Sequence, residues 1–136
     1  MNLAAALAYL ESLELPQGDY AVFGSGPLLI RGIIDNAADL DVIARGAAWE
    51  QAAAAGRLTY LPDHNVTVAS FFGGAITIGT RWAIGDFSVD ELIDTAELID
   101  GIPFVRLEHV RSYKRLAGRR KDIDHLDKLD RWLHAD

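Results

Sequence analysis

The sequence predicts a single α/β (α+β) domain over residues 1–136, with a mixed central sheet flanked by helices and two helices at its C-terminal end. Three observations support this fold class. Half of the 136 residues are hydrophobic, which is enough for one compact core. Short β-prone runs alternate with amphipathic helical patterns along the chain. No internal repeat or low-complexity linker divides the sequence, so we expect one domain.

The first half of the chain alternates between helical and strand patterns. Asn2 is a favourable N-cap for a helix with an apolar stripe, and Pro16 stops that helix. Pro27 follows a glycine turn and marks the first position of a second helix, which ends at Asp35-Asn36. In order, we expect a helix at residues 3–13, a strand at 20–23, a helix at 27–34, a strand at 39–44 and a helix at 47–55.

The second half begins with β-prone runs between turn residues and ends with two helices. Asp100-Gly101 is a strong hairpin signal, and Pro103 is expected to confine the strand after it to a sheet edge. Gly118 separates the two final helices. The expected elements are strands at residues 58–61, 66–72 and 75–79, a helix at 89–93, strands at 97–99 and 102–105, and helices at 107–117 and 120–133.

Charge and composition exclude several classes of function. The chain has no cysteine, which excludes disulfides and thiolate metal sites and agrees with a cytoplasmic location. No apolar run approaches the roughly 18 residues of a membrane helix, so we expect no membrane association. A net charge of −7 disfavours extended nucleic-acid binding. Because nine of the thirteen Lys and Arg residues follow residue 105, a local patch for a small anion such as a triphosphate remains.

A glycine turn lies between the strand at residues 20–23 and the helix after it. The turn, Gly24-Ser25-Gly26, would expose backbone N–H groups at the positive end of a helix dipole, which suits phosphate oxygens. In the alternative interpretation the glycines serve only the geometry of the turn. Leu29 occupies the third glycine position of a G-x-G-x-x-G loop, so we expect no dinucleotide cofactor.

Two aspartates lie two residues apart on the next expected strand. The side chains of Asp39 and Asp41 therefore face one side of the sheet, while Leu40 and Val42 face the other. Carboxylates are ligands that Mg²⁺ prefers, and Mg²⁺ commonly bridges them to substrate phosphates. The alternative is a solvent-facing strand with two acids. We name Asp39 and Asp41 as candidate metal ligands and catalytic residues.

Three basic residues near the C-terminus are candidates for binding a triphosphate. Lys114 shares a helix stripe with core-facing residues, so its ammonium group could point inward as a counter-charge, and Arg119 and Lys121 could add to it. Alternatively, the stem of Lys114 packs while its ammonium group reaches water. Lys121 beside Asp122 is equally consistent with the electrostatics of a helix start.

These motifs together resemble those of the polymerase-beta-like nucleotidyltransferase superfamily. Gly24-Ser25 is followed, after thirteen residues, by Asp39-Leu40-Asp41-Val42. Trp82, Lys114 and the run at residues 118–122 extend the similarity to a family of small, mostly uncharacterised bacterial nucleotidyltransferase-like proteins, over about residues 20–133. The resemblance implies a nucleotidyltransferase-type fold in which the glycine-serine loop holds a triphosphate and the aspartates hold two metal ions.

The chain departs from the resembled pattern at two positions. In the family, the strand before the tryptophan often carries a third acid, where this chain has Thr77. An aspartate also tends to follow three residues after Lys-Asp, where this chain has His125. Two metal ions and an activated hydroxyl need more negative ligands than Asp39 and Asp41 supply alone. Nothing in the sequence places another acid, such as Asp86, beside them.

The sequence thus favours a magnesium-dependent nucleotidyltransferase that transfers a nucleoside monophosphate from a nucleoside triphosphate to a hydroxyl group of an unidentified acceptor. The alternative is a catalytically impaired nucleotide-binding or protein-interaction module, which Thr77 favours. By analogy with the resemblance alone, such a module could belong to a toxin–antitoxin pair and have a protein partner. The candidate nucleotide-binding residues are Gly24, Ser25, Gly26, Lys114, Arg119 and Lys121.

Overall fold

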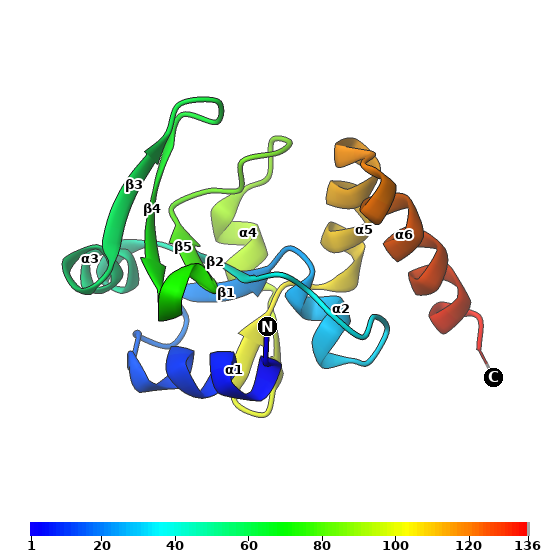
Figure 1. The fold of residues 1–136 in the computed structure, drawn as a ribbon, viewed down its shortest axis with the longest axis horizontal. Coiled ribbons are helices and arrows are strands. Elements are labelled where there is room, and N and C mark those ends of the chain that lie inside the picture. Colours follow the sequence, from blue (N-terminus) through cyan, green and yellow to red (C-terminus); the bar gives the residue numbers. More distant parts are fainter. Residues whose placement is uncertain (136) are drawn as a thin grey trace.

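The computed structural model describes residues 1–135, which form one mixed sheet with helices on both faces (Figure 1). The strands are β1 (Tyr20–Phe23), β2 (Leu40–Ala44), β3 (Arg57–Leu61), β4 (Val66–Phe71), β5 (Ile76–Gly79), β6 (Glu97–Ile99) and β7 (Ile102–Phe104). The helices are α1 (Leu3–Ser12), α2 (Gly26–Ile30), α3 (Gly46–Ala55), α4 (Val89–Asp94), α5 (Leu107–Ala117) and α6 (Arg120–Leu133), with a 3₁₀ turn, η1, at Phe72–Gly74.

The sheet has seven strands in the order β3-β4-β5-β2-β1-β7-β6. β1 pairs parallel with β7 and β2 parallel with β5, whereas the other neighbouring pairs are antiparallel. The mixed sheet and the two C-terminal helices confirm the expected α/β (α+β) class. Within residues 1–135, no helix combines the length and the apolar character that crossing a bilayer requires.

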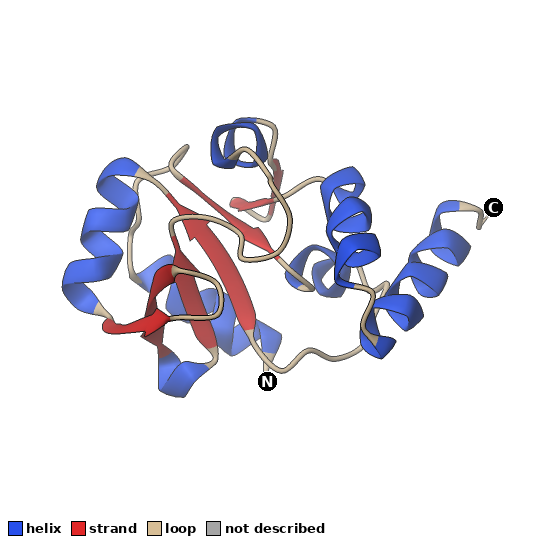
Figure 2. Cartoon of the chain, turned by 90° about the horizontal axis from the view of Figure 1, so that it is seen from above, coloured by secondary structure: helices blue, strands red, loops and turns tan. Residues whose placement is uncertain are grey.

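Alternation along β1 divides the core into two layers (Figure 2). Tyr20 and Val22 pack on one face of the sheet with buried residues of α1 and α3. Ala21 and Phe23 pack on the opposite face, with residues of α2, α4, α5 and α6. Asp41 of β2 is paired in register with Phe23 and therefore belongs to this second face.

The second helix is shorter than the sequence pattern predicts. It ends at Ile30 instead of continuing through residues 31–34, because Gly32 adopts a φ of +73° that a helix does not accommodate. Ile33 and Ile34 lie outside the helix but are still buried, because their side chains pack in the second core layer. A helix of five residues has a small dipole, which weakens the dipole argument for phosphate binding.

Pro103 does not lie on an edge strand, so that prediction is wrong. β7 pairs with β6 on one side and with β1 on the other. The β1–β7 ladder contains one residue pair, Val22 with Phe104, and the Val105 N–H donates to the Val22 carbonyl at 2.9 Å. Pro103 has no backbone N–H to donate. It is tolerated in β7 because so short a ladder has few backbone hydrogen bonds to lose.

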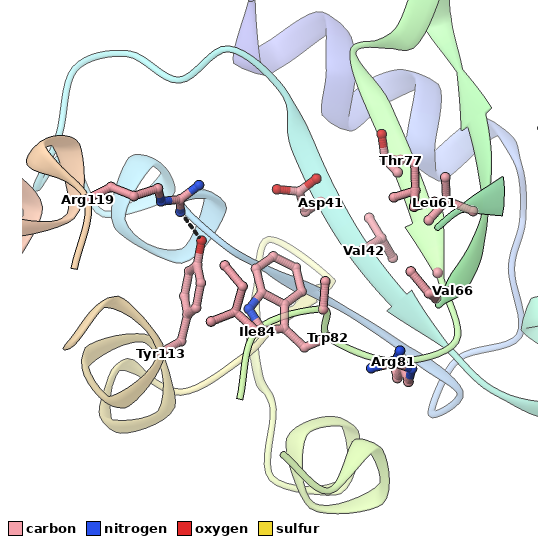
Figure 3. Close-up of a pocket in the computed structure, with 13 residues that line it drawn as sticks. Asp41, Val42, Leu61, Val66, Thr77, Arg81, Trp82, Ile84, Tyr113 and Arg119 are labelled. Atoms are coloured by element: carbon pink, nitrogen blue, oxygen red, sulfur yellow. Dashed lines mark hydrogen bonds between the residues drawn. The ribbon is translucent and has the colours of Figure 1, made fainter. Parts of the chain in front are cut away.

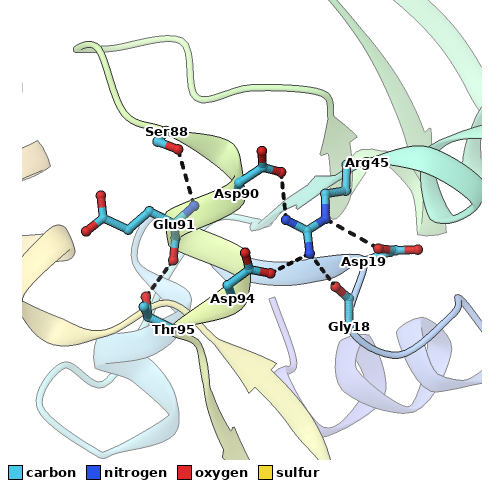
Figure 4. A network of polar contacts seen from close by, with 8 residues as sticks. All are labelled: Gly18, Asp19, Arg45, Ser88, Asp90, Glu91, Asp94 and Thr95. Atoms are coloured by element: carbon cyan, nitrogen blue, oxygen red, sulfur yellow. Dashed lines mark hydrogen bonds and ion pairs between the residues drawn. The ribbon is translucent and has the colours of Figure 1, made fainter.

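Arg45, between β2 and α3, holds three segments together (Figure 4). Its guanidinium group donates to the backbone carbonyl of Gly18 at 2.9 Å. The same group forms ion pairs with Asp19 at 3.3 Å, Asp90 at 2.7 Å and Asp94 at 2.6 Å. The loop before β1 and helix α4 are therefore fixed to the end of β2, the strand that carries Asp41.

We expect Arg45→Met to lower the free energy of unfolding by about 1–2 kcal/mol, because three carboxylates and one carbonyl lose a shared donor. Urea denaturation followed by circular dichroism measures the change. Arg131→Met is the control, because it removes a pair between two exposed side chains on α6 and should leave stability nearly unchanged. Equal losses in the two variants would contradict a special role for Arg45.

Candidate active site

The glycine turn after β1 allows Asp41 to approach the backbone closely. Gly24 has a φ of +64°, and a Cβ atom there would lie 2.9 Å from Oδ2 of Asp41 and 3.2 Å from Cη2 of Trp82. A Cβ atom on Gly26 would lie 2.5 Å from Cγ1 of Val22. Both glycines are therefore required by the shape of the turn.

Ser25 of the turn and the two aspartates line one hollow of about 400 Å³, which we call the loop cavity. The strand was expected to begin at Asp39, but β2 begins at Leu40, so Asp39 lies one residue before the strand and its side chain is exposed, whereas Asp41 is half-buried on the strand. The lining residues are Ser25, Asn36, Ala37, Ala38, Asp39, Asp41, Tyr113, Arg119, Lys121 and His125. The structure thus brings five of the eight candidate site residues to the wall of one cavity.

Lys114 lies behind the turn rather than on the cavity wall. Its side chain is fully buried, so the alternative in which its ammonium group reaches water is wrong. Nζ donates to Oγ of Ser25 at 3.1 Å and to Oδ1 of Asp122 at 3.2 Å. Lys114 therefore acts on the loop cavity through Ser25, whose hydroxyl it positions.

Asp122 is the buried carboxylate that neutralises Lys114. Arg119 donates to Oδ2 of Asp122 from Nε at 2.7 Å and from its backbone N–H at 3.1 Å. Burial pushes the pKa of Asp122 up, but hydrogen bonds from Arg119 and Lys114 outweigh it and hold the pKa below its ordinary value. Arg119 also donates to the hydroxyl oxygen of Tyr113 at 2.6 Å (Figure 3). These contacts fix the α5–α6 junction beside the cavity.

Asp41 has an unfavourable electrostatic environment. Burial, together with the negative charge of Asp39, raises the pKa of Asp41 to about 7. The positive charges of Lys121, Lys114 and Arg119 lower it without restoring the ordinary value. A cation bound beside the two carboxylates would favour the ionised form of Asp41.

A second hollow of about 190 Å³, the sheet cavity, lies on the other side of Asp41. Thr77 of β5 is paired in register with Asp41 and lines this cavity (Figure 3). Trp82 forms one wall, with its ring centroid 4.8 Å from that of Tyr113. Asp41, Tyr113 and Arg119 line both cavities, so the two hollows meet at these side chains.

Thr77 occupies the position at which a third carboxylate would extend the acidic pair. Its half-buried hydroxyl is a neutral ligand, which neither neutralises a second metal ion nor serves as a strong base. Within residues 1–135, no group of three or more His, Cys, Asp or Glu side chains is arranged to hold a metal ion. Asp86 is exposed and lines neither cavity.

Tyr113 and His125 also line the loop cavity, although no sequence motif marked them as site residues. His125 lines the loop cavity, and its buried Nδ1 has no hydrogen-bond partner within residues 1–135. Burial, reinforced by the positive charge of Lys114, lowers the pKa of His125 to about 4, so its imidazole is neutral at neutral pH. The helical spacing of Asp122, His125 and Leu129 would have placed His125 on the inward face of α6.

Comparison with known proteins assigns no family to the chain. No family model, no curated protein and no solved structure matches it.

We expect Asp41→Asn to remove a pH-dependent loss of stability. Because the pKa of Asp41 is about 7 in the folded chain and lower when unfolded, the folded state binds more protons between about pH 4 and 7. Stability from this group is present below that range and is lost as pH rises through it. Over this pH range, urea denaturation should show a loss on the order of 4 kcal/mol in the wild type relative to Asp41→Asn.

Asp86→Asn is the control for this measurement, because Asp86 is exposed. Its unfolding free energy should follow the wild-type pH dependence. A wild type and an Asp41→Asn variant with parallel pH profiles would contradict the raised pKa of Asp41.

We expect Lys114→Met to destabilise the protein by about 3 kcal/mol, because the buried carboxylate of Asp122 loses one of its donors and Ser25 loses its partner. Lys128→Met is the control. It breaks an ion pair with Asp124 between two exposed side chains on α6 and should have little effect on stability. In a double-mutant cycle, Lys114→Met with Asp122→Asn should lose less stability than the two single variants added together. Additive losses would show that the pair is not coupled.

Proposed function

We propose that the protein is a magnesium-dependent nucleotidyltransferase that transfers a nucleoside monophosphate from a nucleoside triphosphate to a hydroxyl group of an acceptor. The observation that carries the proposal is the meeting of Ser25, Asp39 and Asp41 at one cavity. Arg119 and Lys121 line the same cavity. Carboxylates and cations around one hollow suit a ligand made of phosphates and a divalent ion. We also propose a cytoplasmic location for the protein.

The phosphate groups would bind between the glycine turn and the basic residues. Gly24 and Gly26 let the turn pack closely against Asp41 and Val22, and the Ser25 hydroxyl, which lines the cavity, is held in place by Lys114. Arg119 and Lys121 would add charge-assisted hydrogen bonds to the outer phosphate oxygens. Because α2 is a short helix, these side chains are expected to contribute more than its dipole.

Asp39 and Asp41 would hold Mg²⁺ together with phosphate oxygens. The residues fit this ion, because both ligands are hard carboxylate oxygens beside the same cavity, and a bound cation would offset the burial and the charge of Asp39 that raise the pKa of Asp41. When bound, Mg²⁺ would neutralise charge that develops on the phosphates during transfer. With only two acids, we expect one ion to bind with the nucleotide.

The proposed reaction is a displacement at the α-phosphorus. The acceptor oxygen forms a bond to that phosphorus, the bond to the bridging oxygen breaks, and pyrophosphate leaves with the electron pair. The sheet cavity shares Asp41 with the loop cavity, which makes it the expected place for the acceptor. Thr77 cannot serve as the base that accepts the proton of the acceptor hydroxyl, so this proton would pass to water.

A second candidate function is a catalytically impaired nucleotide-binding or protein-interaction module. The hydroxyl of Thr77 beside Asp41 favours it, because this is the register position at which another carboxylate would complete the acidic group. Such a module would keep nucleotide binding and lose transfer. A toxin–antitoxin-type component would in addition bind a protein partner.

We expect isothermal titration calorimetry to show that ATP, GTP, CTP or UTP binds in the presence of Mg²⁺ and binds at least tenfold more weakly without it. Asp41→Asn should remove the effect of Mg²⁺ while raising thermal stability at pH 8, so its loss of binding cannot be due to unfolding. Asp86→Asn should behave as the wild type. Absence of magnesium-dependent binding for all four nucleotides would reject the transferase and the nucleotide-binding module, and would leave only the protein-interaction module.

Pyrophosphate release then separates the two functions. Release by the wild type, lost in Asp41→Asn, supports the transferase. Binding without release supports the impaired module, and release that appears only in Thr77→Glu would identify the missing carboxylate as the cause.

A further inference from the structure

The sheet has two free edges, and only one of them is protected. β6 has three residues, and its Glu97 forms ion pairs with Arg31 at 3.5 Å and with Arg106 at 3.8 Å. β3 has five residues and pairs with β4 alone (Figure 1). The free backbone groups of such an edge favour pairing with another strand.

β3 carries few of the features that usually prevent edge pairing, since its one charged residue, Arg57, is at its first position and Pro62 lies just beyond its end. It contains neither proline nor lysine, and its register with β4 runs without a bulge over five residue pairs. Two of its apolar side chains, Leu58 and Tyr60, are 52% and 55% exposed. Both sit on the same side of the strand, because they are two residues apart.

We propose that β3 pairs antiparallel with β3 of a second copy of the chain, with Thr59 on the two-fold axis. In this register Leu58 lies opposite the partner's Tyr60, so the exposed apolar side chains cover one another. Arg57 lies opposite the partner's Leu61, which keeps the two arginines at opposite ends of the ladder. The strand is therefore complementary to itself.

The charges near the strand ends match this arrangement. Among residues 1–135, neither Arg57 nor Asp63 takes part in an ion pair. Asp63 lies in the turn that directly follows β3. Antiparallel pairing brings it beside the partner's Arg57, and the two-fold symmetry creates this contact twice. Charge complementarity thus favours a second copy of this chain as the partner.

The expected dimer is weak. One five-residue edge buries less surface than the roughly 800 Å² per partner of a standard stable interface, so we expect a dissociation constant in the micromolar range. Leu61 lines the sheet cavity, so the partner's Arg57 would lie at the outer rim of that cavity. A role for this arginine toward an anionic acceptor rests on the proposed function, whereas the dimer itself does not.

Sedimentation velocity between about 1 and 500 μM tests the dimer without any nucleotide. The wild type should form more dimer as its concentration rises. Thr59→Lys should raise the dissociation constant at least tenfold, because two positive charges then face each other on the axis. Leu98→Lys, at an exposed position on β6, is the matched control and should associate as the wild type. A wild type that stays monomeric, or equal loss in both variants, would overturn the proposal.

A charge swap tests the register. Arg57→Glu should weaken the dimer by placing like charges together, and Arg57→Glu with Asp63→Arg should restore it. Because the chain has no cysteine, Thr59→Cys should also give a disulfide-linked dimer on oxidation faster than Leu98→Cys. Failure of the swap to restore association, or equal rates of crosslinking, would rule out this strand pairing.

Discussion

The buried contact between Lys114 and Asp122 is the interaction on which the site depends. It joins α5 to the start of α6, and through the hydroxyl of Ser25 it joins both helices to the glycine turn. Two charges in the core are tolerable only when each is paired and hydrogen-bonded, and Arg119 supplies the remaining donors to Asp122. The same contacts hold Arg119 and Tyr113 over the meeting point of the two cavities.

Sheet register provides the other half of the site. β1 and β2 are antiparallel neighbours, so Phe23 at the end of β1 lies beside Asp41, and the turn that follows comes against the carboxylate. β2 and β5 are parallel neighbours, which sets Thr77 beside the same residue. Asp41 is thus fixed between a backbone turn and a hydroxyl by strand pairing alone, while the side chains of α5 and α6 add the positive charge.

Local patterns in the sequence predict most of the fold, since apolar periodicity and turn residues mark the helices and strands, and N-caps at Asn2 and Ser88 mark the starts of α1 and α4. Asn2 caps α1 as expected, and the alternation around Asp41 places it on the correct face. The position of Pro103 in an inner strand was not predictable, because the sequence does not show how few residue pairs join β7 to its neighbours. The partners of Lys114 were not predictable either, because Asp122 and Ser25 meet it only through the packing of α5 and α6 against the turn.

The proposed cation site depends on the charges around Asp41 and not on the proposed transfer reaction. Three basic side chains act on Asp41, yet burial and the charge of Asp39 still raise its pKa to about 7. The basic side chains therefore do not fully offset the effect of burial and of Asp39 on the pKa of Asp41. A purely structural ion pair would be arranged as Asp122 is, with donors in direct contact and a lowered pKa. The contrast between these two carboxylates assigns Asp122 to the fold and supports the proposal that a cation binds beside Asp41.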